Sequence, residues 1–142
     1  MITELSPGSS FVHGSGHGLP GGNPNPWSLH LSFVAENEGV ITTRFTAHPG
    51  LQGYRGILHG GVIAALLDTA MTQCLFYHGV QALTGDLRVR FVKPVACTET
   101  LEIRAWIASS CPPLYELKSE LGVAGATLAR ARARFMQRAD LS

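Results

Sequence analysis

The chain has 142 residues, of which 45% are hydrophobic and only 15% are charged, and its formal net charge is +1. This length and composition are typical of one compact domain with a core of its own. The nearly balanced charge argues against a nucleic-acid partner and against binding to an acidic membrane surface.

The first 27 residues are predicted to be irregular, because glycines and prolines recur throughout them. His13 and His17 have no cysteine or carboxylate pattern beside them, so we interpret them as surface histidines rather than metal ligands. The first ten residues lack a basic region followed by an apolar one, so we expect no signal peptide and a cytoplasmic protein. We assign residues 28–142 to the folded domain.

Two short strands are predicted next, over residues 28–34 and 40–46. The first alternates apolar and polar side chains, and the second is rich in β-branched and aromatic residues. Residues 36–39 between them are typical of a hairpin turn. A glycine-containing loop over residues 48–58 then leads away from this hairpin.

The one predicted helix spans residues 61–77, with Gly79 just beyond its end as a stop signal. Apolar residues occupy nearly every face of this helix, so we expect a sheet or a partner subunit to cover it. An aspartate at its centre argues against a membrane span, because a charge there is costly in lipid.

Four more strand patterns follow the helix, over residues 82–92, 100–108, 114–121 and 126–136. The last one alternates alanine with arginine, and this period of two indicates a strand with one solvated face. A nucleic-acid stripe is the alternative reading of the arginines, but the small net charge favours the solvated face. The order of elements predicts an α+β fold with an antiparallel sheet of about six strands packed on one helix.

Asp68 is the only Asp, Glu, Lys or Arg between Gly56 and Gly85. A carboxylate in so apolar a helix is costly, and burial raises its pKa. Positions three and four residues away on the helix offer no cation to pair with it. Acidic groups kept in such places are candidates for acid–base or nucleophilic catalysis, with a buried ion pair or a hydrogen bond to a loop as the alternative.

The start of the helix is a second candidate site. His59, Gly60 and Gly61 include none of the side chains that commonly cap a helix, so we expect its first N–H groups to be free. Free N–H groups and the helix dipole attract developing negative charge, as an oxyanion site requires. An ordinary glycine-rich loop is the alternative interpretation.

Residues 53–71, with a His-Gly-Gly turn and an acidic residue nine positions after the histidine, resemble the signature of PaaI-type hotdog thioesterases. Residues 87–94 are similar to the strand that follows the helix in that family, and the order of elements matches over 28–136. The resemblance implies a hotdog fold, in which a curled antiparallel sheet wraps around one long central helix. It also implies a homodimer or homotetramer that hydrolyses acyl-CoA at the dimer interface, with neither a metal nor another cofactor.

Carried over by position, the resemblance makes Asp68 the general base or the nucleophile. The N–H of Gly60 or Gly61 would polarise the thioester carbonyl. His59 would shape the turn, and Thr72, one helical turn beyond Asp68, would position water.

The resemblance also implies substrate-binding residues. Gln52 lies in the region where many relatives carry an asparagine. Arg88, Arg90 and Lys93 are candidates for contacts with CoA phosphates, with an ordinary solvent-facing position as the alternative for each.

Two other functions remain open from the sequence. A hotdog enoyl-CoA hydratase would pair a histidine with an acid; His78 lies near the helix end, poorly placed for this, whereas His59 remains a candidate. A non-catalytic acyl-CoA binding or sensing protein is the second alternative, because the fold does not enforce hydrolysis.

Overall fold

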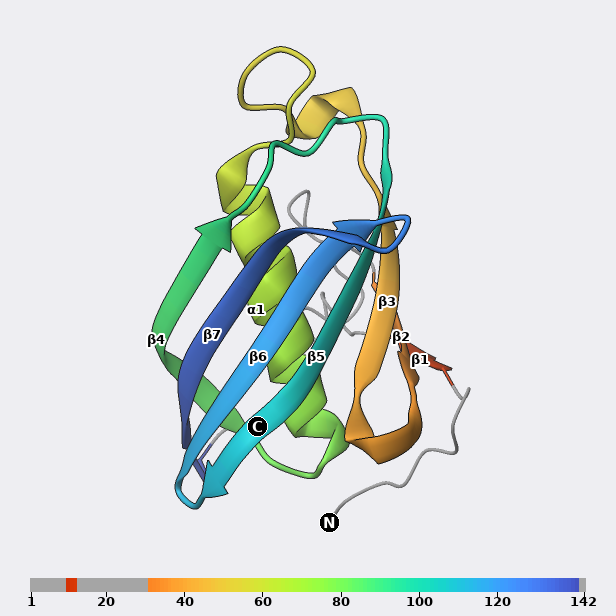
Figure 1. Ribbon diagram of the computed structural model, residues 1–142. Helices are drawn as coiled ribbons and strands as arrows, with labels where there is room; N and C mark the ends of the chain where they lie inside the picture. Colours follow the sequence, from red (N-terminus) through yellow and green to blue (C-terminus); the bar gives the residue numbers. More distant parts are fainter. Residues whose placement is uncertain (1–9, 13–30, 141–142) are drawn as a thin grey trace, which may run out of the picture.

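The computed structural model describes residues 10–12 and 31–140, which form one antiparallel sheet packed against one α-helix, with two short 3-10 helices, Asn37–Gly39 and Pro49–Leu51, in the connections (Figure 1). The strands follow one another across the sheet in the order β1-β2-β3-β5-β6-β7-β4, so β4 forms an edge. The helix α1 spans Gly60–Tyr77. The strands are β1 (Ser10–Val12), β2 (Ser32–Ala35), β3 (Ile41–Thr46), β4 (Ala82–Phe91), β5 (Thr100–Cys111), β6 (Leu114–Val123) and β7 (Ala126–Gln137).

The predicted α+β order of elements is confirmed, and a seventh strand joins it. β1 lies in the segment that was predicted to be irregular, and it pairs antiparallel with β2. The remaining residues of that segment, His13 and His17 included, and residues 28–30 lie outside the described residues. The helix begins one residue earlier than predicted, and β5 continues to Cys111 because it stays paired with β6 up to their hairpin.

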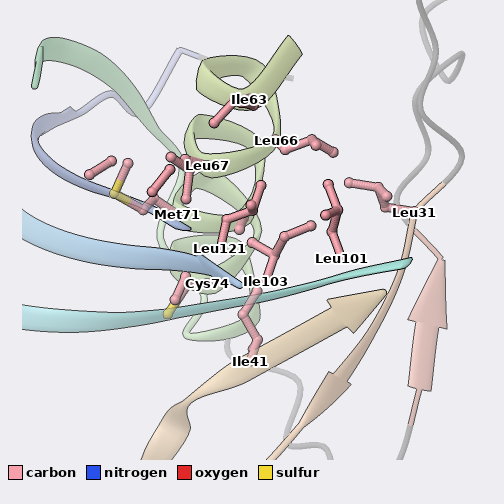
Figure 2. Close-up of a cluster of buried hydrophobic side chains, with 14 of the residues drawn as sticks. Leu31, Ile41, Ile63, Leu66, Leu67, Met71, Cys74, Leu101, Ile103 and Leu121 are labelled. Carbon is pink, nitrogen blue, oxygen red and sulfur yellow. The ribbon is translucent and has the colours of Figure 1, made fainter. Parts of the chain in front are cut away.

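The core fills the space between the helix and the sheet, as Figure 2 shows. Leu66, Leu67 and Met71 of α1 point at side chains such as Ile103 and Leu121 of the strands, and all five are fully buried. The alternation in β7 follows the same division, because its alanines face the helix and its arginines are exposed. The prediction of a strand with one wet face is therefore confirmed.

The sheet covers only one side of α1. The helix has the length and mean hydropathy of a membrane span, yet its buried residues pack on the sheet, as expected of a core helix. Ala65 and Phe76 are exposed on the uncovered side. The sequence led us to expect that a sheet or a partner subunit covers the helix. Within the single chain, the sheet covers one side of it.

The edge strand β4 has a free side and an apolar inner face. It pairs with β7 alone among the described strands. Leu87, Val89 and Phe91 lie opposite the buried alanines of β7, which places them on the helix side of the sheet. Phe91 is nevertheless 54% exposed, because nothing in the described chain lies beyond this edge.

Replacing Leu121 with alanine is expected to destabilise the fold strongly. Leu121 is fully buried under the helix, so Leu121→Ala should lower the free energy of unfolding by about 2–5 kcal/mol. Leu114→Ala on the same strand is the matched control, because Leu114 is 50% exposed and should lose far less. Chemical denaturation of both variants measures the difference, and equal losses would contradict the packing described above.

Candidate active site

Asp68 lies on the side of α1 that faces the edge strand β4. Its carboxylate accepts a hydrogen bond from the Thr84 hydroxyl, with 2.8 Å between Thr84 Oγ1 and Asp68 Oδ1. Thr84 pairs with Phe135 of β7, a buried position, so its side chain is directed to the helix side of the sheet. Helix and strand together therefore place one hydroxyl donor on one half-buried carboxylate.

Burial raises the pKa of Asp68 above its ordinary value of 3.8, and the hydrogen bond from Thr84 acts against this rise. Within residues 10–12 and 31–140, no Lys or Arg side chain forms an ion pair with Asp68. The buried ion pair that the sequence left open is thus absent from the described chain. A carboxylate held by a neutral hydroxyl keeps a basic oxygen for chemistry, as a general base or nucleophile requires.

His59 caps the start of the helix, so the expectation of an uncapped first turn is wrong. Its Nδ1 accepts the Gly61 N–H at 2.8 Å, and its carbonyl accepts the N–H groups of Val62 and Ile63. Imidazole was not among the capping groups considered, although Nδ1 accepts hydrogen bonds as an Asx or Ser oxygen does. His59 shapes the turn, as the resemblance implies.

The Gly60 N–H is the donor that remains at the helix start. No acceptor for it is found among the described residues, in contrast to the Gly61 N–H. The Phe91 ring of β4 lies beside it, because a Cβ placed on Gly60 would stand 3.5 Å from that ring. Of the two predicted oxyanion donors, the geometry therefore favours Gly60.

Asp68 and the Gly60 N–H are too far apart to act on one carbonyl group within a single chain. Eight residues of α-helix separate them, a rise of about 12 Å along the axis. An oxyanion donor must lie about 3 Å from the oxygen, and a nucleophile or water about 3 Å from the carbon. The structure brings Asp68 together with Thr84, and Gly60 together with Phe91, as two separate half-sites.

Gln52 and Thr72 have structural partners. Gln52 Oε1 accepts the Gly56 N–H at 3.0 Å, which closes the turn that leads into the His-Gly-Gly segment. Thr72 donates its hydroxyl hydrogen to the Asp68 carbonyl at 3.0 Å. In this arrangement Thr72 can offer water only an acceptor oxygen.

The three basic candidates separate into two groups. Arg88 and Arg90 point to the outer face of the sheet, because Val89 between them lies opposite the buried Ala131. They are therefore not brought together with Asp68 of the same chain. Lys93 is exposed two residues beyond Phe91, at the end of the sheet where the helix begins.

Thr84 is the site residue that the sequence reasoning missed. A threonine in a strand carries no signal of its own, since it is a common strand former. Its neighbour Gly85 marks a break in pairing, with a register shift between Thr84 and Asp86. That irregularity becomes a pointer to the site only once β4 is known to lie beside α1.

No group of three or more histidine, cysteine or carboxylate side chains suited to a metal ion occurs in the part of the chain that the structure describes. Cys74 is buried, and burial raises the pKa of its thiol to about 12, so it is not a thiolate nucleophile.

Comparison with known proteins matches the segment that contains Asp68 and Thr84 to a family model. Residues 55–110 match the family model of the Thioesterase superfamily. Over 76 residues, 54% of this chain, the sequence is 34% identical to acyl-coenzyme A thioesterase THEM4 of Bos taurus. The aligned part spans about a third of that relative, 31% of its length.

The fold is shared with solved structures of other proteins. The E. coli PaaI protein from the phenylacetic acid degradation operon superposes with a TM-score of 0.74 at 18% identity, covering 87% of this chain and 91% of that one. A Streptococcus mutans protein bound to acetyl CoA gives 0.72 at 17% identity, covering 77% and 89%. The hotdog fold and the resemblance to PaaI-like thioesterases are thereby confirmed.

Removing the Thr84 hydroxyl should raise the pKa of Asp68 further. Thr84→Val removes the interaction that lowers this pKa and leaves the desolvation that raises it. The pH at which the Asp68 carboxyl ionises, followed by carbon NMR, is expected to move upward. Thr84→Ser keeps the hydroxyl and should leave the titration near that of the wild type; an unchanged titration in Thr84→Val would contradict the assignment.

Proposed function

We propose that this chain, which resembles PaaI-like hotdog thioesterases in its fold and around its central helix, hydrolyses acyl-CoA thioesters. One observation carries the proposal: Asp68 is half-buried, without a cation, and held by Thr84 within the segment that matches the Thioesterase superfamily. Hydrolysis of a thioester needs a base or nucleophile and a donor for the oxyanion. Asp68 and the Gly60 N–H supply these two groups.

The reaction follows from these groups. Ionised Asp68 either removes a proton from water as it attacks the thioester carbonyl carbon or attacks that carbon itself. The carbonyl oxygen gains negative charge, which the Gly60 N–H and the helix dipole stabilise. The carbon–sulfur bond then breaks, and CoA leaves as a thiolate that takes the proton held by Asp68 in the first route and a proton from water in the second. The direct attack forms a mixed anhydride with Asp68, which water hydrolyses to the free acid.

A complete site requires two copies of the chain, because the two half-sites of one helix are about 12 Å apart. The free edge of β4 lies beside both half-sites, and its inner face is apolar and partly exposed. Antiparallel pairing of two β4 strands would cover that edge and bring Asp68 of one chain toward the helix start of the partner. We therefore propose a homodimer as the active unit, with a homotetramer as a dimer of such dimers.

The acyl chain would meet apolar side chains of β4 such as Phe91, and the CoA phosphates would meet Lys93. The acetyl CoA bound by the Streptococcus mutans neighbour supports a CoA ester as the substrate class. Within one chain, nine and ten helical positions separate His59 and His78 from Asp68, but the proposed dimer would bring a helix start toward Asp68, so the crotonyl-CoA assay decides between a hydrolase and a hydratase. His59 caps the start of α1 through its Nδ1, and His78 Nε2, just beyond the end of the helix, contacts the Gly39 carbonyl at 3.1 Å.

Asp68→Asn should abolish most of the hydrolysis. The amide can neither accept a proton nor attack a carbonyl carbon, so thiol release from acetyl-, hexanoyl-, palmitoyl-, phenylacetyl- and benzoyl-CoA should fall by at least about 100-fold. Asp86→Asn is the matched control, since Asp86 lies on the outer face of β4. Acyl-CoA binding without release by the wild type would indicate a sensor, and hydration of crotonyl-CoA a hydratase.

A charge on the inner face of β4 should separate the subunits and remove activity together. Val89→Glu would bury a carboxylate against the partner strand, so light scattering after size-exclusion chromatography should show monomers. Leu114→Glu, on β6 and two strands from the edge, should keep both the assembly and the activity. A folded, fully active Val89→Glu monomer would contradict the shared site.

A further inference from the structure

The outer face of the sheet carries rows of charged side chains that run across the strands. Pairing sets Asp86 opposite Arg134, and Arg134 opposite Glu116, so this row alternates in sign. Such alternation is what a solvated sheet face normally shows, because opposite charges stabilise one another across strands.

The next row contains only positively charged side chains. Arg88 lies opposite Arg132, and Arg132 lies opposite Lys118, so three cations follow one another on β4, β7 and β6. Like charges directly opposite each other destabilise a sheet. The repulsion is reduced by carboxylates of the first row, which form ion pairs of 3.9 Å with Arg88 (Asp86) and 3.5 Å with Arg132 (Glu116).

Arg90 and Arg130 extend the cationic surface on the other side of this row. They too lie directly opposite each other, on β4 and β7. The following residue across the sheet is Glu120, whose carboxylate is shared with Arg104 at 3.6 Å. Two successive arginine pairs therefore stand side by side, and cations outnumber carboxylates here although the whole chain has a net charge of only +1.

An aromatic ring ends the cationic row. Trp106 of β5 lies opposite Lys118, and it is partly exposed with Arg104 5.6 Å from its ring. A groove of about 440 Å³ runs along these residues. Its charged and aromatic lining consists of Arg88, Arg90, Trp106, Lys118, Glu120, Arg130 and Arg132.

We propose that this outer groove, Arg88 to Trp106, binds a nucleoside polyphosphate. Guanidinium groups bind phosphate oxygens in pairs, and a multiply charged anion relieves the repulsion within the row. The indole offers a base a surface on which to stack. From Arg88 to Trp106 the row crosses three strand spacings, about 14 Å, comparable with an extended nucleoside diphosphate.

The groove is separate from the candidate active site of its own chain. Its charged and aromatic side chains lie on the sheet face opposite α1, whereas Asp68 and Thr84 lie on the helix side. Nucleotide binding here does not depend on hydrolysis, so it can be tested whether or not the proposed thioesterase activity is found.

Calorimetric titration of the full chain with ADP, ATP, pyrophosphate and adenosine tests the proposal. We expect ADP and ATP to bind, pyrophosphate to bind more weakly, and adenosine not to bind measurably. The combined change Arg88→Ala and Arg132→Ala should weaken ADP binding at least tenfold. Arg134→Ala, in the alternating row, should change it by less than twofold.

Three further binding measurements identify the ligand. Trp106→Ala should weaken ADP but leave pyrophosphate unchanged, and Asp68→Asn should bind ADP like the wild type. Competition between ADP and desulfo-CoA shows whether the nucleotide part of CoA or a free nucleotide is the better ligand, and either result supports the site. Absence of binding by every phosphate probe at millimolar concentration, or equal losses in Arg134→Ala and the double variant with circular dichroism unchanged, would overturn it.

Discussion

A half-buried carboxylate without a cation is the constraint on which the rest of this structure depends. The apolar surroundings of Asp68 raise its pKa, and the proposed hydrolysis requires that it remain able to ionise. An arginine partner would lower that pKa and make the carboxylate a weaker base. A hydroxyl partner stabilises the charge less, so Thr84 orients Asp68 while leaving most of its basicity. This choice of partner is only possible where a strand passes close beside the helix, and β4 is that strand.

The position of β4 at the edge of the sheet leaves a surface exposed, and the proposed shared site would use that surface. An edge strand with unpaired backbone groups and exposed apolar side chains invites association. In this chain that edge lies beside the helix face which the sheet leaves uncovered, so one partner would cover both surfaces. The proposed dimer would also account for a helix that is apolar on nearly all sides although the sheet packs against only one. The low charge content of the chain is consistent with this exposed apolar surface on α1 and β4.

Much of this could be predicted from the sequence, because the relevant signals are local. Period-two patterns gave the strands after the helix, including the alanine–arginine strand whose residue types favour a helix. Asp68 stood out because no other Asp, Glu, Lys or Arg is near it in the chain. Thr84 could not be found in this way, since its role depends on contact with a residue sixteen positions earlier. His59 was interpreted too narrowly, because its capping nitrogen depends on the backbone conformation of the turn. Arg88 and Arg90 were candidates by proximity in sequence, and the register of β4 decides which face they occupy.

The period of two also allows one strand to serve two unrelated surfaces. On β4, Thr84 and Phe91 face the helix, whereas Arg88 and Arg90 face outward, so the two sets do not compete for space. The register break at Gly85 keeps Thr84 directed at Asp68 while the following residues still alternate against β7. A shift of one residue would direct arginines at an apolar helix and apolar side chains at water, which makes the register costly to change. The helix-side carboxylate and the outer cationic row are thus fixed by a single pairing, that of β4 with β7.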